Sequence, residues 1–187
     1  MLNYNNVLKD ELNHNGLSIR EVSPVMKLNL RGKKREFFTA VGKNLNMILP
    51  TEANTSSVSD KLTSIWLSPD EWMIVSNETI QKDNNRYELE ESLYNNISKT
   101  NLGAVTDVTD QFVLLELKGE NIFELFASGS PFNFNDFKEK KGSATQTLLN
   151  NIDVIIHHKD KYLISLFVRR SFSEHLWSWI NDSASRL

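Results

Sequence analysis

Residues 62–76 read LTSIWLSPDEWMIVS, two apolar runs joined by a short polar segment. The polar segment is Ser-Pro-Asp-Glu, in which Pro69 presets the φ angle of a turn and Asp70 is a favoured neighbour. The two runs, Leu62–Leu67 and Trp72–Ser76, are each of a length that suits a strand. The stretch therefore predicts a β-hairpin, and its neighbours place that hairpin in the middle of a larger unit.

The segment before the hairpin predicts a strand, a helix and a loop. Residues 25–32 alternate apolar and polar side chains and end at a glycine, which is typical of a half-buried strand. A helical pattern ended by Pro50 comes next. Its expected apolar face consists of Phe38, Val41, Leu45 and Ile48. Residues 51–61 are rich in Ser, Thr and Asn and predict a loop.

A second helix and a short strand follow the hairpin. The helix has apolar residues every four positions with a tyrosine alongside, namely Leu89, Leu93, Ile97 and Tyr94. Residues 104–108 then predict a strand. The complete order is strand, helix, strand, strand, helix, strand, which is the order of the ferredoxin-like split βαβ unit.

A similar order of elements begins again near Gly103. The expected strands are residues 112–119, 144–149, 154–158 and 162–169, with a short helix at 121–127. A loop at 128–143 contains three phenylalanines that could hold it to the core. The last helix opens with a capping-box spacing. Its expected buried stripe consists of Phe172, Leu176, Trp179 and Ile180.

These patterns together predict an α+β protein made of two ferredoxin-like halves. We expect a polar leader at residues 1–20, the first half at residues 21–103 and the second half at residues 104–187. The two halves share the order of their elements but no repeated sequence.

The composition excludes several classes of function. The chain has 187 residues, with 21 Lys and Arg against 24 Asp and Glu, a net charge of −3. This balance lacks the positive excess that tracks a phosphate backbone, so we expect no nucleic-acid partner. The absence of cysteine excludes disulfides, thiolate zinc sites and cysteine nucleophiles. No signal peptide is readable and no apolar run approaches the ~20 residues of a membrane span, so we expect a cytoplasmic protein with no membrane partner.

No motif for phosphate, metal or nucleophilic chemistry emerges from the sequence. Neither G-x-x-x-x-G-K nor G-x-G-x-x-G occurs. His157 and His158 are adjacent on an expected strand, so they point to opposite faces and do not easily share a metal. His14 lies in the polar leader, and His175 lies on an exposed flank of the last helix. We therefore predict no catalytic, cofactor-binding or metal-binding residue in this chain.

The carboxylates Asp107 and Asp110 leave two interpretations open. They flank Val108-Thr109 between two expected strands, and a pair of acids can perform acid–base catalysis. Asp and Thr are also the residues with which strand ends satisfy free backbone N–H groups. The structural interpretation has the better support, because no second acid pair or serine–histidine spacing accompanies them.

Arg169, Arg170 and Trp177 are the candidates for a partner-binding surface. Of two neighbouring strand residues, one faces inward or toward a partner while the other faces out. Guanidinium groups suit bidentate pairing with carboxylates, including at interfaces. A strand end that places its charge in solvent is an equally open alternative. Trp177 falls outside the expected stripe of the last helix, and a monomer has no reason to keep such aromatic surface exposed.

Three stretches together resemble one family, the gamma chain of heterotetrameric sarcosine oxidase. Residues 66–72, WLSPDEW, are close to its W-L-G-P-D-E-W hairpin, and residues 105–110, VTDVTD, are similar to its V-x-D-V-S-D. Residues 167–173, FVRRSFS, followed by Leu176-Trp177, are similar to its V-R-R-S-F and L-W ending. The resemblance covers most of the chain.

The resemblance implies a non-catalytic accessory subunit that packs on the alpha chain of a complex also containing beta and delta chains. Members of the family resemble the folate-binding domains of glycine-cleavage T-proteins, which agrees with two ferredoxin-like halves. The parent complex, an oxidoreductase acting on CH–NH donors, oxidatively demethylates sarcosine to glycine and passes the one-carbon unit to tetrahydrofolate. The resemblance places its FAD, FMN, NAD, tetrahydrofolate and zinc on the other chains.

A second class of function stays open beside this one. The chain could be a stand-alone folate-dependent enzyme of the aminomethyltransferase type, or a folate-binding protein. In that case Asp107 or Asp110 would hold or protonate the pterin and the amine. Binding of a reduced folate by the isolated chain distinguishes the two classes.

Overall fold

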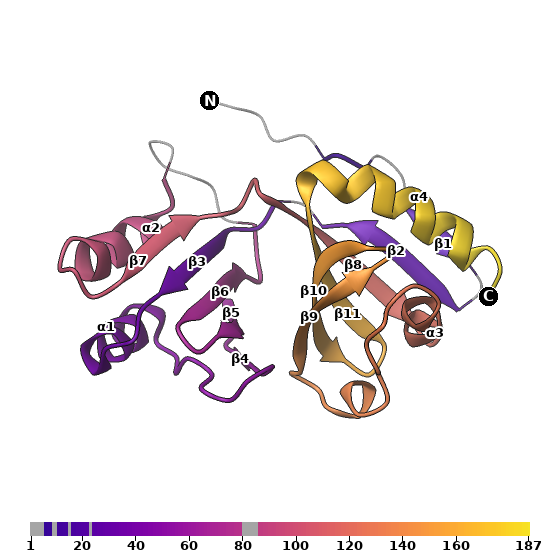
Figure 1. The fold of residues 1–187 in the computed structure, drawn as a ribbon. Helices are drawn as coiled ribbons and strands as arrows, with labels where there is room; N and C mark the ends of the chain where they lie inside the picture. The colour runs from indigo at the N-terminus through magenta and orange to yellow at the C-terminus, as the bar shows by residue number, and fades with distance from the viewer. Residues whose placement is uncertain (1–5, 9–10, 15, 23, 80–85) are drawn as a thin grey trace. The chain divides into compact units, whose positions relative to one another are not determined.

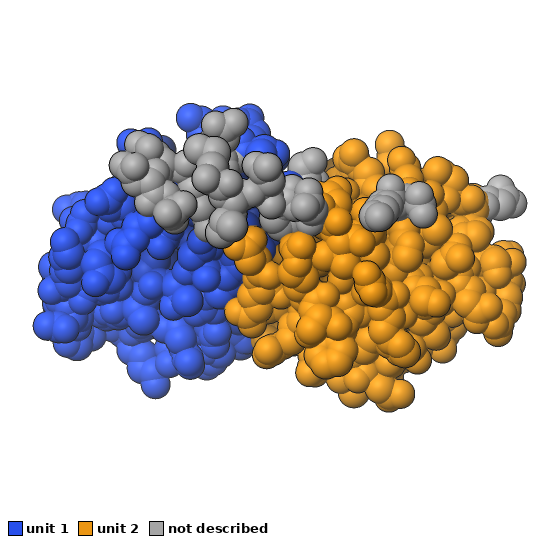
Figure 2. Space-filling view, turned by 90° about the horizontal axis from the view of Figure 1, so that it is seen from above, with its two compact units in different colours: residues 1–3, 24–109 blue, residues 4–23, 110–187 orange. Residues whose placement is uncertain are grey.

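The chain forms an α+β protein with two antiparallel sheets (Figure 1). The computed structural model describes residues 6–8, 11–14, 16–22, 24–79 and 86–187. Two compact units are present, coloured separately in Figure 2. The first holds residues 24–109, and the second holds residues 110–187 together with the described residues from 6 to 22.

The first unit is built on a five-stranded sheet with the order β4-β5-β6-β3-β7. Its strands are β3 (Lys27–Arg31), β4 (Ser56–Val58), β5 (Leu62–Ser68), β6 (Glu71–Ser76) and β7 (Ala104–Asp107). The expected hairpin is confirmed as β5 and β6, which pair with Trp66 opposite Trp72. The expected loop at 51–61 is only partly a loop, because β4 lies within it and pairs with β5.

Helices of the first unit cover one face of this sheet. They are α1 (Arg35–Leu45) and α2 (Glu88–Leu93), the latter continued by the π-helical turn η1 (Tyr94–Ser98). Their buried side chains share one core with alternate residues of the strands, such as Leu28 and Leu30 of β3. The Trp72 indole lies in the same core and donates to the Pro50 carbonyl at 2.8 Å.

The predicted apolar face of α1 was partly wrong. The fully buried positions are Phe37, Val41 and Leu45, whereas Phe38 is only half-buried. The helix ends at Leu45 because Asn46 adopts a left-handed conformation with φ of 50°. Ile48 therefore falls outside the helix, and its side chain is 84% exposed.

The second unit is built on a six-stranded sheet with the order β1-β2-β8-β11-β10-β9. Its strands are β1 (Leu12–His14), β2 (Leu17–Glu21), β8 (Phe112–Gly119), β9 (Ala144–Leu149), β10 (Ile152–Asp160) and β11 (Leu163–Arg169). The helices are α3 (Ile122–Ala127) and α4 (Ser173–Ala184), with the 3₁₀ turns η2 (Phe137–Glu139) and η3 (Arg170–Phe172).

The division of the chain differs from the expected one at both boundaries. Part of the expected polar leader forms β1 and β2, and Leu17 and Ile19 of β2 are buried in the core of the second unit. The units separate after Thr109 and not at Gly103. The reason is that β7 pairs with β3 and so belongs to the first sheet.

The start of the last helix is also a correction. Leu176 and Ile180 are fully buried as predicted, and Trp179 packs against the core while partly buried. Phe172, however, belongs to the 3₁₀ turn η3 that precedes α4, and its side chain is 49% exposed. The buried stripe of α4 consists of Ser173, Leu176, Ile180 and Ala184, so the predicted stripe begins one residue too early.

Phenylalanines hold the segment between α3 and β9 to the second core, as expected. Phe134 and Phe137 are buried in that core and Phe132 packs against it. The His158 ring stacks on Phe137 at 5.8 Å between centroids. Its Nδ1 lies 3.1 Å from the Phe137 carbonyl and 3.0 Å from that of Lys140, so Nδ1 carries the proton and donates to them.

In the first unit, two glycines make room for one aromatic ring. A Cβ atom on Gly32 would lie 2.4 Å from the Phe37 ring. A Cβ atom on Gly103 would lie 2.2 Å from the Arg31 carbonyl oxygen and 2.9 Å from the same ring. Phe37 is fully buried, so the neighbours have little space in which to shift.

Gly103→Ala is expected to lower the free energy of unfolding by at least about 2 kcal/mol, because the new methyl group overlaps backbone. Gly42→Ala is the matched control. A Cβ atom on Gly42 meets nothing closer than 3.5 Å, and the helix α1 should gain about 0.5–1 kcal/mol from alanine. Urea denaturation of both variants measures the difference, and equal effects would contradict this packing.

Candidate functional site

The two adjacent arginines lie at the junction between β11 and α4 and are placed differently. Arg169 ends β11, pairs in register with Phe112 of β8, and is exposed. Its guanidinium has no ion pair or hydrogen bond among the residues that the structure describes. Arg170 is half-buried and interacts with other residues of the chain. Its backbone N–H donates to the Gln111 carbonyl at 2.9 Å. Arg170 begins the 3₁₀ turn η3 and is not a strand residue, so the strand alternation expected for the pair does not apply to it.

Trp177 is half-buried and packs against the core of the second unit. The sequence had suggested a more exposed position on the flank of α4. Trp179 packs similarly, and its indole lies over Gly129, where a Cβ atom would approach the ring to 2.4 Å. Both tryptophans therefore contribute to the attachment of α4, and a role of Trp177 at an interface stays a prediction.

His157 is a buried histidine whose surroundings disfavour the protonated, charged imidazole. Its side chain is 2% exposed, in β10 opposite Ser165 of β11. Burial, helped by the positive charge of Lys159 and by His158, lowers the pKa of His157 to about 4. The imidazole is therefore neutral at pH 7.

The other histidines have structural or peripheral positions. The Nε2 atom of His158 is buried with no hydrogen-bond partner in the described chain, in a setting made by Phe123 and Phe137. His175 is exposed, as expected, and lies 3.5 Å from the Asn150 side chain. Described residues include no group of three His, Cys, Asp or Glu side chains that could hold a metal ion.

The end of β7 supports the structural interpretation of Asp107. Its Oδ1 accepts a hydrogen bond from the Thr109 backbone N–H at 2.9 Å. The Thr109 hydroxyl in turn accepts from the Lys27 backbone N–H at 3.0 Å. The Lys27 side chain is 1% exposed, and its ammonium donates to the Val25 and Thr109 carbonyls, both at 3.2 Å. The carboxylate thus completes a hydrogen-bonded strand end, whereas Asp110 is exposed.

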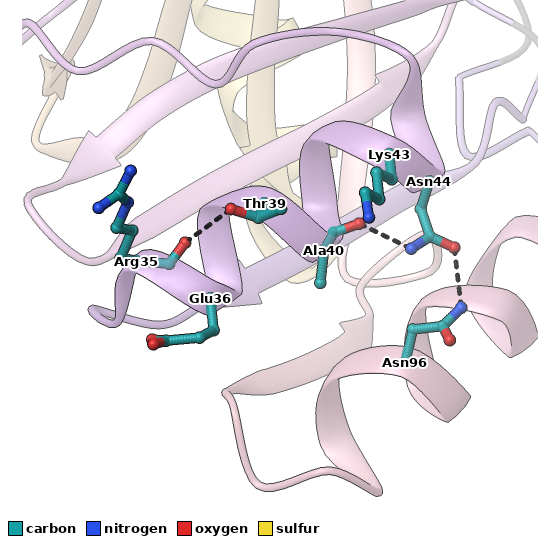
Figure 3. Close-up of a pocket in the computed structure, with 7 residues that line it drawn as sticks. All are labelled: Arg35, Glu36, Thr39, Ala40, Lys43, Asn44 and Asn96. Carbon is teal, nitrogen blue, oxygen red and sulfur yellow. Dashed lines mark hydrogen bonds between the residues drawn. The ribbon is translucent and has the colours of Figure 1, made fainter.

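A groove of about 710 Å³ lies between α1 and η1 (Figure 3). Its lining residues are Arg35, Glu36, Thr39, Ala40, Lys43, Asn44 and Asn96. The Asn44 amide donates to the Ala40 carbonyl at 2.7 Å and accepts from the Asn96 amide at 3.1 Å, which ties the two helices together. Sequence reasoning missed this groove, because its two sides are 52 positions apart. The only signal was the four-residue spacing of Arg35, Thr39 and Lys43.

The fold and the placement of these residues define a class of protein. It is a two-unit α+β protein in which Lys27, His157 and His158 are buried and Asp107 accepts from the backbone at a strand end, with Arg169 exposed at the end of β11. No described helix is long and apolar enough to cross a membrane.

The model of the sarcosine oxidase, gamma subunit family matches residues 32–186. This chain belongs to that family. A comparison with curated protein sequences finds no match.

The fold of this chain is similar to that of a chain in a solved complex. The chain is similar to one from heterotetrameric sarcosine oxidase of Corynebacterium sp. U-96 in complex with pyrrole 2-carboxylate, with a TM-score of 0.81 and 21% identity. The match covers 94% of this chain and 87% of that one, and it establishes a shared fold. The ligand-free regulatory subunit of aspartate kinase from Thermus thermophilus also matches, over 91% of this chain and 97% of that one. Its TM-score is 0.41 at 12% identity, too low to support an argument.

The neutral state of His157 predicts a dependence of stability on pH. Unfolded His157 takes up a proton below pH ~6.5, whereas the folded residue resists it until about pH 4. The free energy of unfolding should therefore be unaffected above this range and fall between pH ~6.5 and 4, by up to about 3 kcal/mol from this residue.

Urea denaturation across this pH range tests the expectation. His157→Gln should flatten the fall relative to the wild type, because the titrating group is gone. His175→Gln is the control, since the exposed His175 should leave the curve unchanged. Parallel curves for the wild type and His157→Gln would show that His157 is protonated as readily folded as unfolded.

Proposed function

We propose that this chain is the accessory gamma-type subunit of a sarcosine oxidase-type heterotetramer and packs on the large alpha chain. The complex would oxidatively demethylate sarcosine to glycine and transfer the one-carbon unit to tetrahydrofolate. The observation that carries the proposal is the family match over residues 32–186, supported by the fold similarity over 94% of the chain.

The finer description of the fold also belongs to this proposal. In the first unit, β3 lies between β6 and β7, and the order along the chain is β3, α1, β5, β6, α2, β7 with β4 added at the edge. This order supports a ferredoxin-like split βαβ half. A relation of the two units to the folate-binding domain of glycine-cleavage T-proteins would follow from it.

An accessory role agrees with the occupation of the groups that chemistry would otherwise use. His157 is neutral and buried, and the Lys27 ammonium donates to backbone carbonyls. Asp107 accepts from the backbone of its own strand end. The FAD, FMN, NAD, tetrahydrofolate and zinc of the proposed complex would therefore lie on its alpha, beta and delta chains.

The rival function, a stand-alone folate-dependent enzyme, has less support. It needs Asp107 or Asp110 to hold the pterin and amine. Asp107 is half-buried and accepts a hydrogen bond from the Thr109 backbone, and Asp110 is exposed.

Expression with and without the other chains tests the proposed function. The purified chain should show no flavin absorbance and no sarcosine turnover. Coexpressed with the alpha, beta and delta chains, it should copurify at one copy per complex. Turnover by the isolated chain would overturn the accessory role.

A folate titration separates the two classes of function. Calorimetry of the isolated chain with a reduced folate should show no binding in the micromolar range. Micromolar binding that is lost in Asp107→Asn or Asp110→Asn would favour the rival enzyme instead.

A further inference from the structure

We propose that the alpha chain of the complex docks on the turn between β11 and α4. Phe172 would be the apolar anchor of this contact and Arg169 its charged neighbour. We call Arg169 and Phe172 the junction surface. The inference rests on the proposed function, because it states which surface of this subunit contacts the complex. The partner site that fits is an apolar pocket with a carboxylate at its rim.

The first observation is the exposure of a large apolar side chain. Phe172 is 49% exposed, although the sequence pattern placed it in the core. No ring contact with another aromatic residue involves Phe172 in the described chain. Aromatic residues that fill a partner's pocket supply much of the binding energy at protein interfaces.

The second observation is that the backbone presenting Phe172 is fixed at both ends. Val168 and Ser173, on either side of the turn, are both fully buried. The Arg170 N–H donates to the Gln111 carbonyl at 2.9 Å, and the Ser173 hydroxyl donates to the Arg170 carbonyl at 2.8 Å. A side chain held on such a turn loses little conformational entropy on binding, which favours tight association.

The third observation is the unused charge of Arg169. Arg20 pairs with Glu116 and Arg31 lies 3.8 Å from both Asp70 and Glu71, whereas the exposed Arg35, like Arg169, has no ion pair among the described residues. Arg169 has neither an ion pair nor a hydrogen bond to any described residue. Its five donors can therefore receive a carboxylate of the partner in a bidentate pair.

Local geometry places the two side chains within reach of one protein partner. Arg169 is the N-cap of the 3₁₀ turn η3, and Phe172 is three residues later. The N-cap and the third helical position lie side by side on a helical turn, as in a capping box. Phe112, opposite Arg169 in register, is half-buried.

A heterologous protein partner fits this surface better than the other macromolecules. The chain carries a net charge of −3, and one unpaired arginine does not make a track for a phosphate backbone. A symmetric contact between two copies, centred on this surface, would bring two unpaired Arg169 guanidinium groups together. A carboxylate-rimmed pocket on a different chain avoids that repulsion.

Binding of purified variants to the complex of the other three chains tests the junction surface. Phe172→Ala should weaken association by ~30-fold or more, as at an interface hot spot. Arg169→Glu should weaken association by at least ~10-fold, because the new carboxylate repels the proposed carboxylate of the partner. The loss of affinity should be larger at low salt, where this repulsion is less screened. The double variant should fail to assemble at concentrations where the wild type is saturated.

Matched controls separate docking from folding. Ile48→Ala removes another exposed apolar side chain, and Arg35→Glu reverses the charge of another exposed arginine. Both should assemble like the wild type. Phe172→Ala should keep the wild-type melting temperature, whereas Trp177→Ala should lower it, because Trp177 packs against the core.

The outcomes distinguish the two proposals. If the wild type assembles and the double variant assembles equally well, the junction surface is not the docking site and the proposed function stands. If Phe172→Ala lowers the melting temperature and Arg169→Glu still assembles normally, the turn is core structure and the inference is overturned. If the wild-type chain binds none of the other chains, the proposed function fails together with the docking surface.

Discussion

The pairing of β2 with β8 is the interaction on which the course of the chain depends. It sets Ile19 opposite Leu117 in one core and Arg20 opposite Glu116, 96 positions later, with a nitrogen–oxygen distance of 2.7 Å. β8 thereby becomes an inner strand, with β11 on its other side. Because β2 precedes the first unit in sequence, residues 24–109 are inserted between two parts of the second unit. Each unit nevertheless keeps its own sheet and core.

Sequence patterns predicted the elements whose signals are local. The Pro-Asp turn between two apolar runs predicts β5 and β6 correctly, because the turn and the strands it joins are adjacent in the chain. The same reasoning missed β1 and β2. Leu17 and Ile19 alternate with polar residues as a strand should, but five residues in a polar, Asn-rich setting carry too little signal. These residues form a strand because they pair with the edge of β8, which lies far away in sequence.

The candidate site shows the same limit at the scale of single residues. Arg169 and Arg170 were identified because neighbouring strand residues face opposite ways, but β11 ends at Arg169 and Arg170 belongs to the 3₁₀ turn η3. Phe172 was misplaced because a 3₁₀ turn precedes α4. Such a turn has 3.0 residues per turn instead of 3.6, so the helical phase of Leu176 and Ile180 does not extend back to residue 172. Spacing alone does not reveal where the period changes.

Rigidity distinguishes the exposed Phe172 from ordinary surface apolar residues. On a mobile loop, such a side chain can fold back against its own protein and lose most of its contact with water. The turn after β11 prevents this, because Val168 and Ser173 are buried and the Gln111 carbonyl holds the backbone between them. Packing of β11 and α4 therefore fixes Phe172 in solvent. The same contacts that join the last strand to the last helix keep this aromatic side chain half-exposed.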